Sequence, residues 1–221
     1  MNGLLESVQV GTEDGQYRVI WLHGLGADGH DFEPIVDELT FANKSDTRFI
    51  FPHAPVRAVT INSGIEMRAW YDIVAMQINE QQDEAGMRKS AQQIEALIEN
   101  EIAQGYESEN ILLAGFSQGG AIALHVGLRY SKPLAGIMAL STYLPLYESV
   151  DKERHAANQN IPIFYAHGSH DPVIPIGMAE ASKDYLLELG YKVQWQTYRM
   201  EHSVVPDEID AIAKFLSQTL S

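Results

Sequence analysis

A serine flanked by two glycines is the residue with the clearest chemical potential in this sequence. Residues 115–119 read Gly-Phe-Ser-Gln-Gly, which gives Ser117 the spacing G-x-S-x-G. Residues 111–114 are an apolar run typical of a buried strand, and residues 121–128 have the composition of a helix packed on a sheet. A sharp turn between such elements exposes the serine hydroxyl, and the glycines avoid a clash there. The pattern predicts a nucleophilic serine, although an ordinary glycine-rich turn can match so short a motif by chance.

An activated serine needs a base, and the base needs a carboxylate to orient it. Sites on parallel sheets gather at the carboxyl ends of strands, where this sequence places His167, His170 and His202. Only His202 also has a carboxylate before it on a separate strand end, Asp171. Alone, Asp171 would be read as a turn residue before a proline and His202 as a residue near a helix start. Together with Ser117, in the order serine, aspartate, histidine, they predict a catalytic triad.

Other groupings of these polar residues are weaker. Asp184 and Asp207 are rival candidates for the acid, but both fall within expected helices or their caps. A metal site at His167, His170 and Asp171 lacks the spacing that puts two imidazoles on one helix face. No metal site is therefore expected.

The glycine-rich segment 23–29, which reads His-Gly-Leu-Gly-Ala-Asp-Gly, follows an expected early strand. Acyl transfer by a serine needs two backbone amides, the oxyanion hole, to hold the negatively charged oxygen of the intermediate. One is expected to be the amide of Gln118, directly after the serine, and the other comes from such a loop, where the amide of Leu25 is expected to supply it. Residues 24–29 also match G-x-G-x-x-G, which makes a nucleotide-binding oxidoreductase the alternative. That fingerprint requires an acid at the end of the next strand. Here Asp46 lies before that strand, on the wrong side.

The elements that must position these residues alternate along the chain. Strands are expected at 17–22, 48–51, 111–114, 134–140, 161–166 and 192–198, and helices at 31–39, 84–104, 121–128, 178–189 and 206–220. Section 56–79 and the piece around 143–160 show no regular pattern. The alternation predicts an α/β fold with a mostly parallel central sheet and helices on both faces. A length of 221 residues fits one domain, 1–221.

Composition limits the classes of partner and the kinds of site chemistry that are expected for this chain. The formal net charge is −15, which argues against nucleic acid or an anionic membrane surface as the main partner, although plain solubility explains it equally well. The chain has no cysteine, so a disulfide, a thiolate nucleophile and a zinc–thiolate site are excluded. Residues 1–6 have no basic region and no apolar core of signal-peptide length, so no signal peptide is expected, and no apolar run reaches the roughly 20 residues of a membrane span. A soluble, cytoplasmic protein is expected.

Six stretches in order carry a family resemblance. They are residues 23–29, 70–73, 115–120, 140–145, 167–168 and Asp171. In these motifs nearly the whole chain resembles the phospholipase/carboxylesterase family of small α/β-hydrolases, which includes acyl-protein thioesterases and bacterial carboxylesterases. The resemblance implies the α/β-hydrolase fold, the Ser117–Asp171–His202 triad, the oxyanion hole described above, no cofactor and often a homodimer. One departure is Glu201, where small or neutral residues are frequent; it could raise the pKa of His202 or point to solvent.

The expected activity is hydrolysis of carboxylic esters or thioesters of short-to-medium acyl chains through an acyl-enzyme. Acyl-protein thioesterase or lysophospholipase specificity is the alternative within the family. Apolar residues from two irregular sections at the catalytic end are the candidate acyl pocket: Ile65, Met67, Trp70, Tyr143, Leu144 and Leu146. Any one of them could instead belong to the core.

Overall fold

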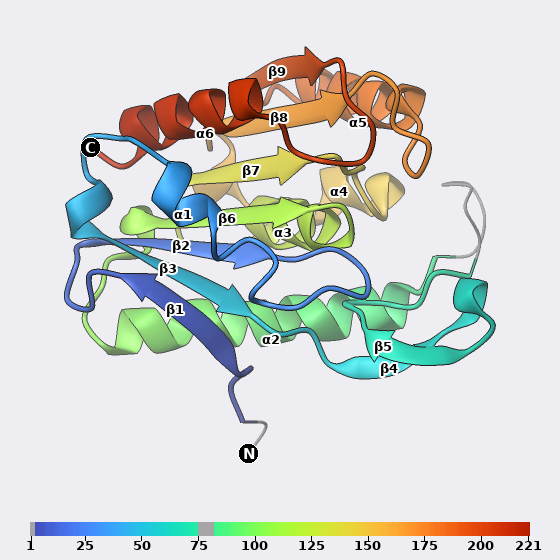
Figure 1. The fold of residues 1–221 in the computed structure, drawn as a ribbon, viewed down its shortest axis with the longest axis horizontal. Helices are drawn as coiled ribbons and strands as arrows, with labels where there is room; N and C mark the ends of the chain where they lie inside the picture. The colour runs from blue at the N-terminus through green and yellow to red at the C-terminus, as the bar shows by residue number, and fades with distance from the viewer. Residues whose placement is uncertain (1–2, 75–81) are drawn as a thin grey trace.

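A single twisted sheet forms the centre of the molecule (Figure 1). The computed structural model describes residues 3–74 and 82–221. In these residues the main sheet has seven strands in the order β1-β3-β2-β6-β7-β8-β9. They are β1 (Ser7–Gly11), β2 (Tyr17–Leu22), β3 (Thr47–Pro52), β6 (Ile111–Phe116), β7 (Gly136–Leu140), β8 (Ile163–Gly168) and β9 (Val193–Tyr198). Strand β1 runs antiparallel to β3 at one edge and the other pairs are parallel, so β6, β8 and β9 end at the same side.

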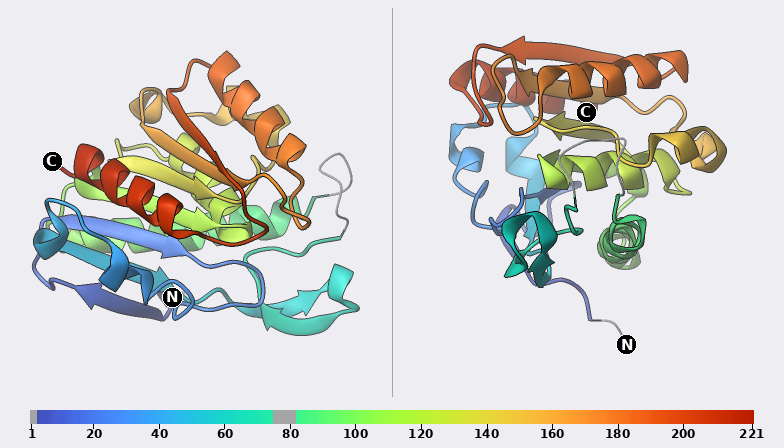
Figure 2. Two further views of the ribbon diagram at one scale, coloured as in Figure 1. Left: turned by 45° about the horizontal axis from the view of Figure 1, so that its top comes forward. Right: turned by 90° about the vertical axis from the view of Figure 1, so that its right-hand side faces the viewer.

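Helices cover both faces of this sheet (Figure 2). Side chains of α1 (Ile35–Glu38) and α6 (Pro206–Thr219) join the apolar core on one face. Side chains of α2 (Glu84–Ala103), α3 (Gln118–Arg129), α4 (Tyr147–Glu153) and α5 (Ile176–Glu188) join the core on the other. Strand β2 is buried throughout because Ile20 enters one core and Trp21 the other. None of the described helices is both long and apolar enough to cross a membrane.

The expected α/β architecture is confirmed, and most expected elements lie within two residues of the observed ones. The helix expected at 31–39 is reduced to α1, which begins after Pro34. A residue before proline is disfavoured in the α-helical region, so the helix cannot extend back through Glu33. The piece around 143–160 contains α4. Short 3-10 turns occupy Lys44–Asp46, Thr60–Asn62, Ser108–Asn110 and Ala156–Asn158.

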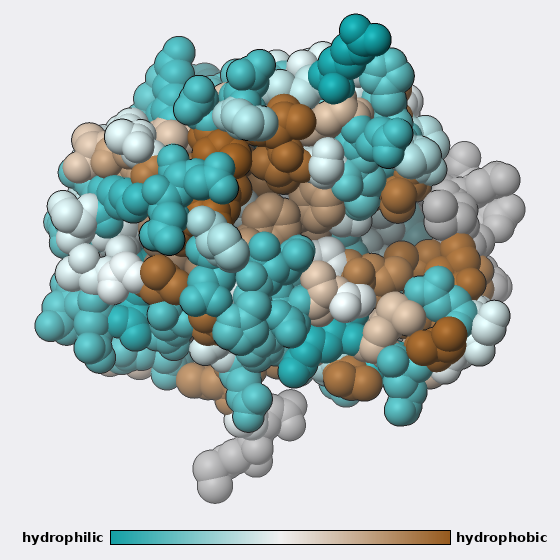
Figure 3. Space-filling view, in the orientation of Figure 1, coloured by the Kyte–Doolittle hydropathy of each residue, from teal (hydrophilic) through white to brown (hydrophobic). Residues whose placement is uncertain are grey.

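A small hairpin was missing from the expectation for section 56–79. Strands β4 (Val56–Val59) and β5 (Ile65–Arg68) pair antiparallel as a separate sheet. The expectation of irregular structure there was therefore wrong for these strands, and residues 75–81 lie outside the described part. The hairpin projects beside the carboxyl ends of the main strands, and its surface is partly apolar (Figure 3). Val56 and Ile65 are about three-fifths exposed, at 60% and 61%.

Candidate active site

Ser117 stands at a strained turn between β6 and α3. Its φ of 55° and ψ of −121° lie in a region that residues with a side chain rarely adopt. A Cβ on Gly115 would come within 2.3 Å of the Gly119 carbonyl, and a Cβ on Gly119 within 2.3 Å of the Leu22 oxygen. Glycine is therefore required at both positions, because a side chain there would collide with the backbone, as the G-x-S-x-G motif predicts.

Asp171 and His202 are directly joined. Strand β8 leads into the loop that bears Asp171, and β9 leads into the loop that bears His202. The Nδ1 atom of His202 lies 2.7 Å from Oδ2 of Asp171, whose carboxylate is fully buried. The other oxygen, Oδ1, accepts the amides of Val173 and Ile174 at 2.8 and 2.9 Å. Asp171 thus both shapes its own turn and holds the histidine, with Nδ1 as the donor.

The His202 ring also lies at the end of the serine's strand. Its centroid is 4.7 Å from that of Phe116, the residue before Ser117. Among the described residues, Ser117 Oγ makes no hydrogen bond to His202. Such contacts often tighten only when substrate is bound. The neighbouring Glu201 is exposed.

The rival polar residues are placed differently. His167 is fully buried, its Nε2 lies 2.8 Å from the Ile174 carbonyl, and burial lowers its pKa, so it is a neutral core histidine. Its Nε2 is 3.5 Å from Asp171 Oδ2. His170 is exposed and pairs with Ser169 Oγ at 3.0 Å. In the described part of the chain no three acidic, histidine or cysteine side chains are grouped so that they could hold a metal ion.

The rival acids take no part in the hydrogen bonds of this arrangement. Asp184 lies on α5, where it is exposed and pairs with Lys183 at 2.8 Å. Asp207 lies in the first turn of α6 and is exposed. Neither contacts a histidine among the described residues.

The loop after β2 lies beside the serine. A Cβ on Gly24 would be 3.5 Å from the Cβ of Ser117, so the loop that bears the Leu25 amide passes close to this serine. Within the described chain, neither the Leu25 amide nor the Gln118 amide donates a hydrogen bond to the protein. Free amides at the start of a helix and in an adjacent loop are suited to an oxyanion.

Buried side chains hold this loop in place, and almost nothing in the sequence pattern predicts them. The amide of Ala54 donates to Nε2 of His23 at 3.0 Å, so the proton is on Nδ1, which lies 2.7 Å from the Gly24 carbonyl. Burial lowers the pKa of His23 to about 4, which keeps it in this neutral form. Trp70 Nε1 donates to the His23 carbonyl at 2.9 Å. The only sequence signal was a histidine directly after a buried strand.

The side chain of Gln118 is engaged in the same brace. Its Oε1 accepts the Trp70 amide and its Nε2 donates to the Tyr71 carbonyl, both at 2.7 Å. The hydroxyls of Tyr71 and Tyr143 are 3.0 Å apart, and burial raises the pKa of both. These hydrogen bonds therefore connect the segment of Trp70 and Tyr71 both to Gln118 of α3 and to Tyr143.

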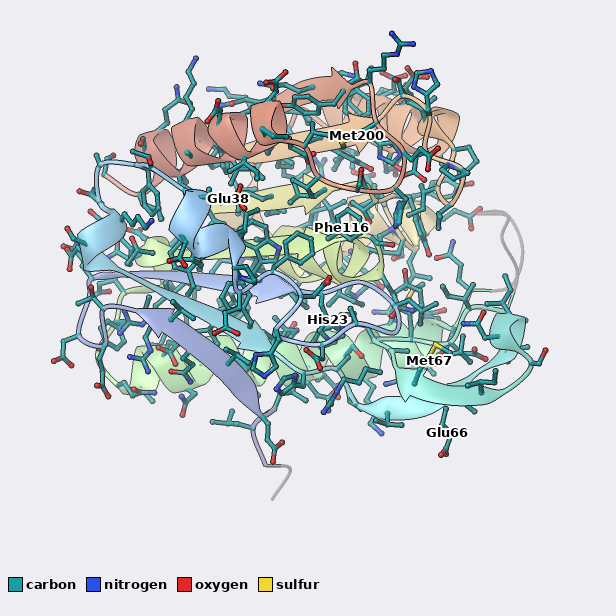
Figure 4. All side chains as sticks on the ribbon, viewed as in Figure 1. His23, Glu38, Glu66, Met67, Phe116 and Met200 are labelled. Atoms are coloured by element: carbon teal, nitrogen blue, oxygen red, sulfur yellow. The ribbon has the colours of Figure 1, made fainter. Side chains whose placement is uncertain are left out.

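The six candidate acyl-pocket residues differ in burial and fall into three groups. Trp70 and Leu144 are in the core, 0% and 1% exposed. Met67, Tyr143 and Leu146 are half-buried, and Ile65 is exposed on β5. The sulfur of Met67 would lie 3.7 Å from a Cβ on Gly26, which brings β5 against the loop after β2 (Figure 4).

The G-x-G-x-x-G match does not have the context of a dinucleotide site. A helix should begin where the glycines end, but residues 30–34 form turns and α1 begins at Ile35. A Cβ on Gly29 would lie 2.3 Å from the Phe51 carbonyl, so this glycine serves packing against β3.

Comparison with known proteins identifies the family. The model of the phospholipase/carboxylesterase family matches residues 5–220. The chain belongs to this family. It is 41% identical to acyl-protein thioesterase 1 of Neurospora crassa over 213 residues, which cover 91% of this chain and 86% of that protein. With acyl-protein thioesterase 1 of Gibberella zeae it shares 37% identity, over 91% and 90% of the two chains.

Solved structures agree. The structure of SOBER1 from Arabidopsis thaliana matches with a TM-score of 0.88 and 31% identity, covering 93% of this chain and 99% of that one. Zea mays acyl-protein thioesterase 2 matches with a TM-score of 0.87 and 26% identity, over 98% and 99%. The α/β-hydrolase fold is therefore confirmed, and this member of the phospholipase/carboxylesterase family is a serine hydrolase of the esterase and thioesterase class.

Proposed function

We propose that Ser117, His202 and Asp171 form the catalytic triad of this hydrolase, which cleaves carboxylic esters or thioesters. The hydrogen bond of 2.7 Å between His202 Nδ1 and the buried Asp171 carboxylate carries the proposal. It leaves Nε2 as the atom that can take a proton. The strained turn at Ser117, one residue from the ring that packs on His202, supports it.

The reaction is acyl transfer to water in two halves. His202 Nε2 takes the Ser117 proton while Oγ attacks the carbonyl carbon, and the Leu25 and Gln118 amides stabilise the oxyanion. The tetrahedral intermediate collapses, and the leaving alcohol or thiol takes the proton from His202. Water, deprotonated by His202, then attacks the acyl-enzyme, and Ser117 regains its proton as the carboxylic acid leaves.

The acyl chain is proposed to lie over the hairpin side of the site. Met67, Tyr143 and Leu146 are half-buried apolar side chains from two sections that meet there, with Ile65 further out. We call these four residues the acyl wall; Trp70 and Leu144 support it from the core. The proposed substrates are esters or thioesters of short-to-medium acyl chains, and the names of the relatives, acyl-protein thioesterase, support a lipidated protein thioester as the alternative. One domain over residues 1–221, a cytoplasmic location and a possible homodimer stay predictions.

Covalent labelling tests the proposal. Intact mass is measured after treatment with a fluorophosphonate for wild type, Ser117→Ala and Ser169→Ala. Ser169 is a matched control because it is an exposed serine 3.0 Å from a histidine nitrogen. One adduct on wild type and on Ser169→Ala, absent from Ser117→Ala, is expected. An adduct that survives in Ser117→Ala, or a folded wild type that takes none, would refute the assignment of the nucleophile.

Removal of the carboxylate tests the rest of the triad. Asp171→Asn is expected to lower turnover by about 10⁴-fold, the scale found for the same change in a serine protease. A series of acetyl to octanoyl esters and the matching thioesters then separates the substrate classes. Turnover close to wild type in Asp171→Asn would contradict the role given to this residue.

A further inference from the structure

The segment that follows β7 contains a second strained residue, next to the nucleophile. Ser141 has a φ of 45° and is fully buried, and its amide donates to the Ala166 carbonyl of β8 at 2.8 Å. This kink stops the strand from continuing straight. It turns the chain so that the residues on either side, Leu140 and Thr142, can both reach Ser117.

Both backbone polar groups of Ser117 are held from this segment. The Ser117 amide donates to the Leu140 carbonyl at 2.9 Å. The Ser117 carbonyl accepts the hydroxyl of Thr142 at 2.6 Å, in addition to the first helix bond from the Ala121 amide at 3.1 Å. The peptide groups on both sides of the nucleophile are therefore fixed by residues 140–142, which fixes the direction of its Cα–Cβ bond.

Thr142 is itself held in place. It is fully buried, and its carbonyl accepts the hydroxyl of Tyr165 at 2.8 Å. A Cβ on Gly120 would lie 2.8 Å from both Cβ and Cγ2 of Thr142. The first turn of α3 thus lacks a side chain at the place where the threonine enters, and this clearance lets the hydroxyl approach the turn.

We propose that Thr142 is a positioning residue for the nucleophile: its hydroxyl holds the Ser117 carbonyl so that the strained turn aims Oγ at the substrate. The inference rests on the proposed function of Ser117. Strained backbone persists only where its surroundings over-determine it, and Thr142 supplies one such restraint. It does not touch the reacting atoms.

Three variants of Thr142 separate the contribution of its hydroxyl from that of its methyl group, and a fourth variant elsewhere is the control. Thr142→Val keeps the shape and loses the hydroxyl, whereas Thr142→Ser keeps the hydroxyl and loses the methyl. Thr142→Ala loses both, so comparison of Ala with Ser isolates the hydroxyl again should the valine variant not fold. Gly177→Ala, on α5 with nothing within 4 Å of the added Cβ, is the control.

The measurements are the second-order rate of fluorophosphonate labelling, kcat and KM for one ester, and Tm. Loss of positioning is expected to lower the labelling rate and kcat of Thr142→Val by about 10- to 100-fold, with KM nearly unchanged. Thr142→Ser is expected to label close to the wild-type rate but to melt at a lower temperature, because it leaves a small cavity. The loss of rate relative to the loss of stability should therefore be much larger in Thr142→Val than in Thr142→Ser.

Two outcomes overturn the inference. One is a Thr142→Val protein that labels as fast as wild type, or a Thr142→Ala protein that labels as fast as Thr142→Ser. The other is a Thr142→Ser protein as slow as Thr142→Val, which would mean that packing of the methyl group matters. If instead wild type is not labelled at Ser117, the proposed function fails first, so the two failures are distinguishable.

Discussion

Glu208 is the buried acid whose titration should be visible in the stability of the whole protein. It lies in the first turn of α6, is 0% exposed, and neither carboxyl oxygen has a hydrogen-bond partner of good geometry among the described residues. Burial raises its pKa to about 8 from 4.5, while the amide of Val205 pulls the pKa down less strongly. Burial also raises the pKa of Tyr198 on β9, and the charges of Glu208 and Asp207 add to that rise.

The direction of the pH effect on stability follows from the protons that the folded and unfolded states bind. Between pH 4.5 and 8 the folded protein keeps a proton on Glu208 that the unfolded chain has lost. The free energy of unfolding therefore falls as the pH rises through this window, by about 1.4 kcal/mol per pH unit. At pH 7 the wild type has lost about 3 kcal/mol relative to pH 4.5, from this one group.

Glu208→Gln keeps the shape of the side chain and removes the titration. Its stability advantage over wild type is expected to grow with pH, by about 3 kcal/mol between pH 5.5 and 8.5. For a chain of this length that corresponds to about 6–12 °C in Tm. Above pH 8 the advantage levels off.

The assay is urea or thermal unfolding from pH 5.5 to 8.5 of wild type, Glu208→Gln and Glu66→Gln. The range begins above the sequence isoelectric point of about 4.8, where precipitation is a risk. Glu66 is an exposed hairpin carboxylate that extends away from the molecule (Figure 4) and serves as the control. If the Glu208→Gln and wild-type curves run parallel with pH, the carboxyl has the same pKa folded and unfolded, and the reasoning is refuted.

Four further predictions concern residues in and around the site. His23 should stay neutral to below pH 5.5 because its pKa is about 4, and its imidazole nitrogen resonances should show Nδ1 protonated; an imidazolium signal above pH 5.5 contradicts this. Met67→Ala should lower kcat/KM more for octanoyl than for acetyl esters, whereas equal losses exclude it from the acyl wall. Trp70→Ala would instead lower stability by about 3–5 kcal/mol, since the ring is in the core. Gly115→Ala should abolish labelling or folding, because its Cβ would lie 2.3 Å from a carbonyl group, while Gly177→Ala should be tolerated; an active Gly115→Ala contradicts the geometry.

The sequence was sufficient to predict the inner strands of the sheet, which are buried on both faces, but the edge strand β1 was not expected because its side chains are only partly buried. Residues 19–22 and 111–114 are continuous apolar runs, and β2 and β6 lie there. The β4–β5 hairpin was missed although residues 65–68 alternate Ile-Glu-Met-Arg, a period-2 signal. Its side chains are largely exposed, so apolar burial does not mark its ends.

The braces of the site were beyond prediction for a different reason. The amide of Trp70 reaches Gln118, 48 residues away, and Thr142 reaches Ser117 over 25 residues. A threonine or glutamine that makes such a bond has the same letter as one that faces solvent. Its partner is set by the packing of separate elements, which local periodicity does not encode.

The strain at Ser117 shows why these distant contacts matter to the chemistry. Backbone in this region costs on the order of 1–3 kcal/mol, so an isolated turn of this sequence would relax and withdraw the hydroxyl. Here the turn makes hydrogen bonds with Leu140, Thr142 and Ala121, each worth about 1 kcal/mol net. Their sum is comparable to the strain, so the loss of one bond should leave the fold intact but shift the turn. Sensitivity of rate without equal sensitivity of stability is therefore the expected signature of every residue that holds this turn.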